Sequence, residues 1–351
     1  MRISKAITDD NYFLVKATLY KAYFDIAMKA NIDIKNAQID IDEFETNETT
    51  AEEKLNNTYK AYKDFFKTLN HILYERRSNT VNKQINLFTT NIDIFIEKLL
   101  EDLDLQFNDG FNGIFNKKFS LSNFKKSFYQ KSLHYDNISE IPVFNLLKIH
   151  GSVTWEMNKG NINFSNLNIL KEVTDEISKI SLLDVKTLND TKWSTDTRNL
   201  TINEIVDEVT KITPIQIVTD FIKSYEKLQI VNPTKDKFKD TTFNKNYYEM
   251  LRLYANELEK ENSALFVMGF SMADEHIREI TIRAIKSNPT LKIFIVSYTK
   301  SANDIIDNFK NDKIDINSFP NVEFINPEDG FNLRKFNEYL LLPLLADIVL
   351  N

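Results

Sequence analysis

Cysteine is absent from this 351-residue sequence. Without thiols the chain cannot form disulfides, bind a metal through thiolates or use a cysteine nucleophile. A zinc ribbon built from two cysteine pairs is therefore excluded. The absence is compatible with a reducing compartment, and we expect a cytoplasmic protein.

Glycine and proline are scarce, with 6 and 7 residues respectively. Residues 1–84 contain no glycine at all. Because glycine lets the backbone turn sharply or approach a ligand closely, each glycine indicates a place where one of these is needed. A glycine-rich phosphate-binding loop is therefore missing from the first 84 residues.

Long apolar runs are missing as well. No stretch approaches the roughly 18 apolar residues of a membrane-spanning helix, and the N-terminus lacks the apolar core of a signal peptide. The net charge of −7 argues against a nucleic-acid partner, since phosphate binding depends on clustered Lys and Arg. The 42% hydrophobic residues and 26 Phe predict a globular protein of one large domain or two ordinary ones.

Apolar periodicity predicts an α/β protein. Helices are expected over 11–30, 58–75, 94–103, 247–258 and 276–285, with short irregular structure over 31–57. Continuous apolar runs predict strands at 85–88, 143–149, 228–231, 264–268 and 293–296. Such strands, alternating with helices, are typical of a parallel sheet covered on both faces, so we expect a Rossmann-like fold. We interpret residues 151–226, which lack a clear boundary, as an inserted and mostly helical module.

Three polar motifs follow predicted strands. They are Thr89-Thr90-Asn91-Ile92-Asp93, His150-Gly151-Ser152 with Trp155 beyond it, and Gly269-Phe270-Ser271 leading to Asp274. Ligands of open parallel sheets bind at the carboxyl ends of the strands, where these motifs lie. Each motif alone also has a structural explanation, because Asn91, Asp93 or Ser271 can cap a helix and His150 can be an interior histidine.

Together, the motifs resemble a known family. The segments INLFTTNIDIFIE, NDGFNGIF, LLKIHGSVTW, IVNPTKDKF and ALFVMGFSMADEHI are similar to bacterial SIR2-like (sirtuin-related) proteins, many of which act in anti-phage defence. The resemblance extends from about residue 58 to the C-terminus. It implies a single SIR2-like domain over 1–351, with the insertion at 151–226. TTNID resembles the sirtuin TQNID motif, with Thr90 in place of a glutamine that contacts ribose.

The resemblance implies NAD hydrolysis to nicotinamide and ADP-ribose. Asn91 would orient a water or the ribose hydroxyls, and Asp93 would hold the nicotinamide carboxamide. His150 would be the general base, which suits an imidazole whose unperturbed pKa is about 6.5. The remaining cofactor-binding residues implied by the family are Thr89, Thr90, Gly151, Gly269, Ser271, Ser297 and Tyr298, and no metal is required.

The sequence departs from the family in two ways. The missing cysteines exclude the sirtuin zinc ribbon, which points away from deacylation and toward NAD cleavage. The missing glycine-rich loop indicates that the first β-α unit is absent through truncation, an alternative start or divergence, and it predicts weakened NAD binding. The alternative hypothesis is a catalytically impaired SIR2-like subunit for assembly or sensing.

Partners and secondary residues follow from the same comparison. The family implies NAD depletion after infection, carried out by a homo-oligomer or beside a HerA-like ATPase. Asp274 is expected to cap the helix that contains His276, which argues for a structural role of that histidine. The loop around Asp109 either packs over the pocket or contacts substrate, and Trp155 either stacks on the ligand or fills the core.

Overall fold

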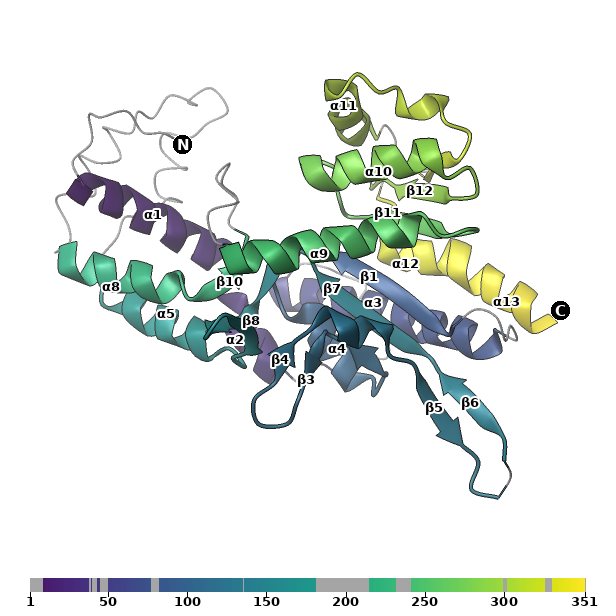
Figure 1. The fold of residues 1–351 in the computed structure, drawn as a ribbon, viewed down its shortest axis with the longest axis horizontal. Helices are drawn as coiled ribbons and strands as arrows, with labels where there is room; N and C mark the ends of the chain where they lie inside the picture. The colour runs from purple at the N-terminus through teal and green to yellow at the C-terminus, as the bar shows by residue number, and fades with distance from the viewer. Residues whose placement is uncertain are drawn as a thin grey trace. The chain divides into compact units, whose positions relative to one another are not determined.

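Two compact units make up the chain in the computed structural model (Figure 1). Unit 1 comprises Met1–Gln38, Asn86–Lys126 and Phe144–Tyr247, and unit 2 comprises Ile39–Ile85, Ser127–Val143 and Tyr248–Asn351. The structure describes residues 9–37, 39, 43–44, 50–76, 82–134, 136–180, 215–231, 241–298, 302–325 and 330–350. Both units are assembled from segments far apart in sequence, so neither could be delimited as one stretch of chain.

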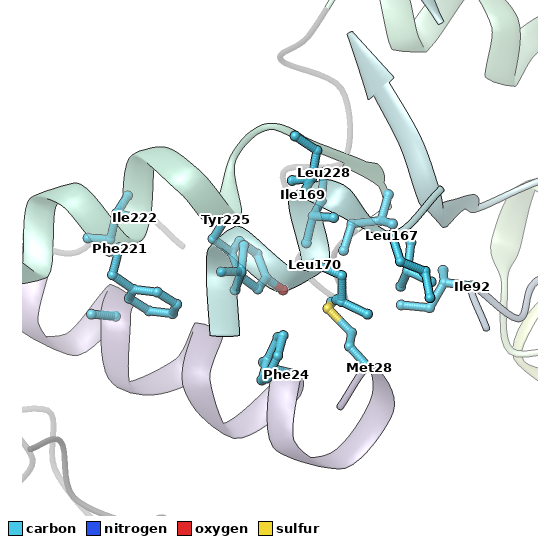
Figure 2. Packing of buried hydrophobic residues seen from close by; sticks show 14 of the residues in the cluster. Phe24, Met28, Ile92, Leu167, Ile169, Leu170, Phe221, Ile222, Tyr225 and Leu228 are labelled. Atoms are coloured by element: carbon cyan, nitrogen blue, oxygen red, sulfur yellow. The ribbon is translucent and has the colours of Figure 1, made fainter. Parts of the chain in front are cut away.

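Helices of unit 1 pack around an apolar core. They are α1 (Asp9–Ala27), α2 (Ala30–Asn36), α4 (Phe95–Asp102), α5 (Asn168–Ser178) and α8 (Ile215–Tyr225). Figure 2 shows Phe24 and Met28, from α1 and the turn after it, beside Tyr225 and Leu170, with Phe221 one turn away on α8. Phe24, Leu170 and Phe221 are at most 1% exposed, so burial of apolar surface stabilises this helical layer.

Two sheets complete unit 1. One has the order β1-β7-β2, formed by β1 (Gln84–Thr89), β7 (Val143–Lys148) and β2 (Phe107–Asn108), and β1 and β7 continue across the boundary from unit 2. The second sheet is antiparallel and has the order β10-β8-β9-β4-β3. Its strands are β10 (Leu228–Ile230), β8 (Gly151–Asn158), β9 (Asn161–Phe164), β4 (Lys118–Phe119) and β3 (Phe111–Asn112), and the 3-10 helix η1 (Leu121–Lys125) follows β4.

Parallel pairing in the first sheet rests on three observations. β2 and β7 pair in parallel, with Phe107 opposite Phe144. The N–H of Val143 donates to the carbonyl of Lys83 and the N–H of Ile149 to that of Thr89, both at 2.9 Å. The residue numbers of the bonded partners increase along both strands, as they do in parallel pairing. The carboxyl ends of β1 and β7 therefore lie at one edge of the sheet.

Unit 2 contains a second parallel sheet, of order β11-β12-β13. Its strands are β11 (Ala264–Met268), β12 (Lys292–Val296) and β13 (Val322–Ile325). Helices and turns of unit 2 are α3 (Ala51–Glu75), α10 (Glu275–Ser287), α11 (Asn303–Asn311), η2 (Ile316–Ser318), α12 (Leu333–Phe336), the π-helical η3 (Asn337–Leu341) and α13 (Leu342–Leu350). A separate hairpin pairs β5 (Phe128–Lys131) with β6 (Ile138–Ile141), and α9 (Thr241–Leu258) crosses the boundary between the units.

The expected fold class is therefore met at the level of mixed α/β structure, with parallel strands alternating with helices. The parallel strands form two three-stranded sheets among the described residues. Over the same part of the chain, no helix has the combined length and apolar character needed to cross a membrane.

The expectation for residues 31–75 was wrong. The helix expected at 58–75 begins at Ala51, because Thr50 and Glu53 form a reciprocal capping box, and α2 occupies part of the segment expected to be irregular. In the segment 151–226, expected to be an inserted and mostly helical module, the strands β8 and β9 precede the helices α5 and α8. That segment also belongs to unit 1 and pairs with β10; its residues 181–214 lie outside the described ranges.

Candidate functional site

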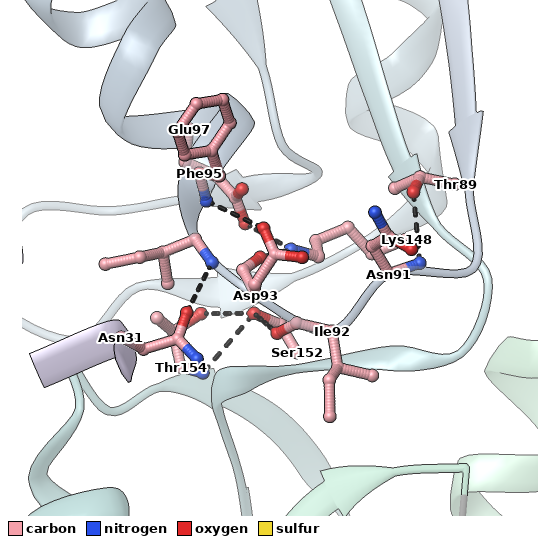
Figure 3. A network of polar contacts seen from close by, with 11 residues as sticks. Asn31, Thr89, Asn91, Ile92, Asp93, Phe95, Glu97, Lys148, Ser152 and Thr154 are labelled. Carbon is pink, nitrogen blue, oxygen red and sulfur yellow. Dashed lines mark hydrogen bonds and ion pairs between the residues drawn. The ribbon is translucent and has the colours of Figure 1, made fainter. Parts of the chain in front are cut away.

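The turn after β1 carries the first predicted motif. Thr89, the last residue of the strand, accepts a hydrogen bond through its Oγ1 from the backbone N–H of Asn91 at 3.0 Å (Figure 3). Thr90 is half-buried, and the side chain of Asn91 is exposed. The local hydrogen bond turns the chain immediately after the strand. The side-chain amide of Asn91 stays accessible to solvent.

Asp93 ends this turn, one residue before Ile94, the N-cap of α4. Asp93 Oδ1 accepts the N–H of Phe95, the first residue of the helix, at 2.9 Å. The Asp93 side chain therefore satisfies one free N–H at the start of α4, from the position before the N-cap. At least one carboxylate oxygen of Asp93 is engaged by the helix start, where a carboxylate also interacts favourably with the helix dipole.

An ion pair between the buried Lys148 and the half-buried Glu97 lies beside the turn. The ammonium of Lys148, the last residue of β7, donates to the backbone carbonyl of Asp93 and to Glu97 Oε1, the latter at 2.8 Å. Lys148 is 4% exposed. Burial raises the pKa of the Glu97 carboxyl, and the adjacent Lys148 charge opposes that effect.

Further hydrogen bonds hold the same turn from two other elements. The carbonyl of Ile92 accepts the N–H of Val153 at 3.0 Å, and Ser152 Oγ lies 3.0 Å from Thr154 Oγ1 beside it. Asn31 of α2 is 1% exposed and accepts the N–H of Ile94 at 2.9 Å. Figure 3 shows Asn31, Ser152 and Thr154 around the turn, which is held by α2, β7 and β8.

His150 and Gly151 follow β7 at the neighbouring strand end. His150 is half-buried, its ring centroid lies 6.3 Å from that of Tyr247, and its carbonyl accepts the N–H of Val231 at 2.8 Å. Gly151 begins β8 with a φ of 78°, and a Cβ at this position would lie 2.0 Å from the carbonyl oxygen of Gln229. The close approach of β10 thus explains the glycine without a ligand.

Strand pairing brings these two motifs to one edge of the sheet. The hydrogen bond from Ile149 to Thr89 places the residue before His150 opposite the residue that opens the Asn91 turn. Both motifs belong to unit 1. Such an edge, at the carboxyl ends of parallel strands, is the common location of ligand sites in α/β proteins.

The other predicted site residues belong to unit 2. Gly269 follows β11 with a φ of 61°, and its missing Cβ would meet open space. Ser271 is exposed, and its carbonyl accepts Asn308 Nδ2 at 2.8 Å. Ser297 is buried after β12, whereas Tyr298 is exposed and its carbonyl accepts the N–H of Gly330 at 2.9 Å.

Residues with an open role are clarified by the structure. Asp274 Oδ1 accepts the N–H groups of His276 and Ile277 and thus caps α10, as expected. Trp155 is 3% exposed and packs against Phe111 and Phe119, so it fills the core.

The loop around Asp109 is held by its own neighbours. Asp109 Oδ1 accepts the N–H of Phe111 at 3.0 Å. Burial raises the pKa of the Asp109 carboxyl, against the effect of that hydrogen bond. The contacts of this loop thus support a structural role.

Two surface hollows belong to unit 2. One has a volume of about 590 Å³ and lies beside α10, with Arg283, Lys286 and Asp312 among its lining residues. The other has about 340 Å³ and is lined by α9 and α10, including Arg252 and His276. Neither involves Asn91 or His150. Within the described ranges, no three or more His, Asp or Glu side chains are grouped as metal ligands.

Sequence reasoning missed Lys148, Glu97 and Asn31. A usable signal existed for Lys148, because it is a lone lysine in an apolar strand, two residues before His150. Asn31 gave no such signal, since a segment rich in Asn and Asp is ordinarily read as a loop. No family model matches the chain, and no curated protein matches it either.

Proposed function

We propose that the chain is a SIR2-like protein that cleaves the bond between nicotinamide and ribose in NAD. The observation that carries the proposal is the pairing of β1 and β7 in parallel, with the Asn91 turn and His150 at their carboxyl ends. The proposal includes a Rossmann-like sheet as the specific form of the α/β fold. Hydrolysis would yield nicotinamide and ADP-ribose.

The chemistry uses groups that this edge of unit 1 supplies. Nicotinamide leaves as a neutral molecule, so the ribose carbon passes through a cationic transition state that orientation and electrostatics can favour. The exposed amide of Asn91 would orient the attacking water or the ribose hydroxyls. His150 would accept the proton, since histidine is the side chain most often used as a general base.

Other residues of the turn after β1 would assist catalysis by Asn91 and His150. Thr89 shapes the turn, and Asp93 would hold the nicotinamide carboxamide with the oxygen that the helix start does not use. The family context would be defence by NAD depletion in the cytoplasm, in a homo-oligomer or with a HerA-like ATPase.

A second candidate function is a catalytically impaired subunit for assembly or sensing. The observation that favours it is the absence of glycine from residues 1–84, where the family carries its phosphate-binding loop. Backbone amides need an unobstructed approach to a pyrophosphate, and side chains at those positions would obstruct it.

Release of nicotinamide from NAD by the purified chain tests the first proposal. His150→Ala should lower turnover by about 100-fold or more, because a general base contributes on the order of 10²–10⁴. Asn91→Ala should lower it similarly. Matched controls are His134→Ala and Asn158→Ala, both at exposed positions, which should retain wild-type turnover.

Titration calorimetry with NAD separates the two candidates. Binding that persists in His150→Ala without turnover supports the enzyme, since the base acts after binding. Absence of both heat and nicotinamide release from the wild-type chain would support the impaired subunit and contradict NAD cleavage. Turnover unchanged in His150→Ala would contradict the assignment of the base.

A further inference from the structure

Lys148 is buried where an apolar residue would be expected. It ends β7, a strand whose six residues are all buried, and it is itself 4% exposed. Removing an ammonium from water is unfavourable unless nearby acceptors replace the lost hydration. The acceptors here are the Asp93 carbonyl and Glu97 Oε1.

Stability alone is a weak explanation for this arrangement. Replacing a buried ion pair by apolar side chains of similar size is commonly neutral or stabilising. The pair is also incompletely satisfied, because Glu97 Oε2 is buried and has no hydrogen-bond partner among the described residues. Helix α4 carries a contrasting pair, Lys98 with Asp102, which is more exposed and remains within the helix.

Lys148 connects the two segments that carry the predicted catalytic residues. On one side it belongs to the strand that continues, two residues later, into His150. On the other side it binds the carbonyl of Asp93, two residues after Asn91. The ammonium thus links the strand of His150 to the turn that carries Asn91, and Glu97 orients the ammonium from α4 (Figure 3).

We propose that Lys148 is a positioning residue that holds the Asn91 turn in register with His150. The inference rests on the proposed function, for which it supplies the group that sets the spacing between the two catalytic residues. Lys148 touches neither substrate nor reacting atoms in this scheme. It acts on the peptide between Asp93 and Ile94, whose far side is held by Asn31.

Two variants separate positioning from stability. Lys148→Met leaves Glu97 buried without its counter-charge, so both stability and turnover should fall. Lys148→Met/Glu97→Met removes both charges and should recover stability in urea. The donor to the Asp93 carbonyl is still missing from the double variant, so its kcat should stay lower by about tenfold or more, with KM within about threefold.

The matched control is Lys98→Met, which removes the lysine of the Lys98–Asp102 ion pair on α4, the helix that carries Glu97. It should keep kcat within about twofold of wild type. Recovery of kcat together with stability in the double variant would overturn the proposal and leave the pair as a structural element. A kcat for Lys148→Met equal to that of wild type would overturn it as well.

Hydrogen exchange without NAD tests the same inference if the chain proves inactive. In the double variant the amides of Asn91 and Phe95, which bond within the turn, should exchange about tenfold faster than in wild type. The amide of Phe144, which bonds Gln106 in the sheet, should be unaffected. Unchanged exchange at Asn91 and Phe95 would overturn the positioning role independently of any catalytic result.

Discussion

Replacing Gly151 by alanine should separate β8 from β10. The new Cβ would lie 2.0 Å from the carbonyl oxygen and 2.9 Å from the carbonyl carbon of Gln229. Both are backbone atoms, so no side-chain rotation can relieve the clash. The strand itself must move, and with it the 2.8 Å hydrogen bond from Val231 to the His150 carbonyl.

Gly160 provides a matched control for the size of this effect. Its φ of 77° is nearly equal to the 78° of Gly151, but a Cβ there would have no atom within 4 Å. Gly160→Ala should therefore lower the free energy of unfolding only by the cost of a left-handed backbone, about 1–2 kcal/mol. Gly151→Ala carries that cost and an overpacking cost of about 1–3 kcal/mol, for a total of about 2–5 kcal/mol.

Urea unfolding measures the difference directly. Trp155, 3% exposed in unit 1, reports the transition when Trp193 is replaced by phenylalanine in all variants. Gly151→Ala should have the lower midpoint of the two alanine variants. Equal midpoints for Gly151→Ala and Gly160→Ala would refute the steric explanation, and weakened NAD binding with equal midpoints would assign Gly151 to the ligand.

Three further changes test the contacts described above. Asp274→Ala removes both N-terminal hydrogen bonds of α10 and should lower the free energy of unfolding by about 1 kcal/mol, measured in urea; no change would contradict the capping role. Asn31→Ala leaves the buried N–H of Ile94 without its acceptor and should destabilise unit 1 by about 1–3 kcal/mol in the same assay, whereas a loss below 0.5 kcal/mol would mean that the clamp is replaced easily. Burial raises the pKa of Tyr254 to about 12, against the effect of its hydrogen bond with Thr281, so its neutral form stabilises the fold below pH 10 and this contribution is lost as the pH rises through 12. Tyr254→Phe should reduce the fall in stability between pH 10 and 12, and an unchanged slope would contradict the assignment.

Much of the candidate site could be predicted from the sequence, because neighbouring residues indicate where a strand ends. A continuous apolar run followed by Thr89-Thr90-Asn91 predicts a strand and its end, and the structure places β1 at Gln84–Thr89. The same holds for β7 and His150, and for β11 and Gly269. These predictions rest on hydrophobic patterning and turn-forming residues, which act over a few neighbouring positions.

The reasons for individual residues depended on distant parts of the chain. The family resemblance assigned Gly151 to cofactor binding. In the structure the backbone of Gln229, far along the sequence, occupies the space that a Cβ of Gly151 would need. Lys148 read as part of an apolar strand, yet it reaches Glu97 and Asp93. Asn31 lay in a segment expected to be irregular, yet it binds Ile94.

The sequence by itself therefore determined the absence of thiolate chemistry, the α/β class and the positions of the principal strands. Each of these follows from composition or from patterns that short-range interactions impose. Only the tertiary structure decided how the described parallel strands divide between two three-stranded sheets, why Gly151 must lack a side chain, and which buried lysine supports the turn after β1. Those features depend on which distant segments approach each other, and a pattern of neighbouring residues does not encode that approach.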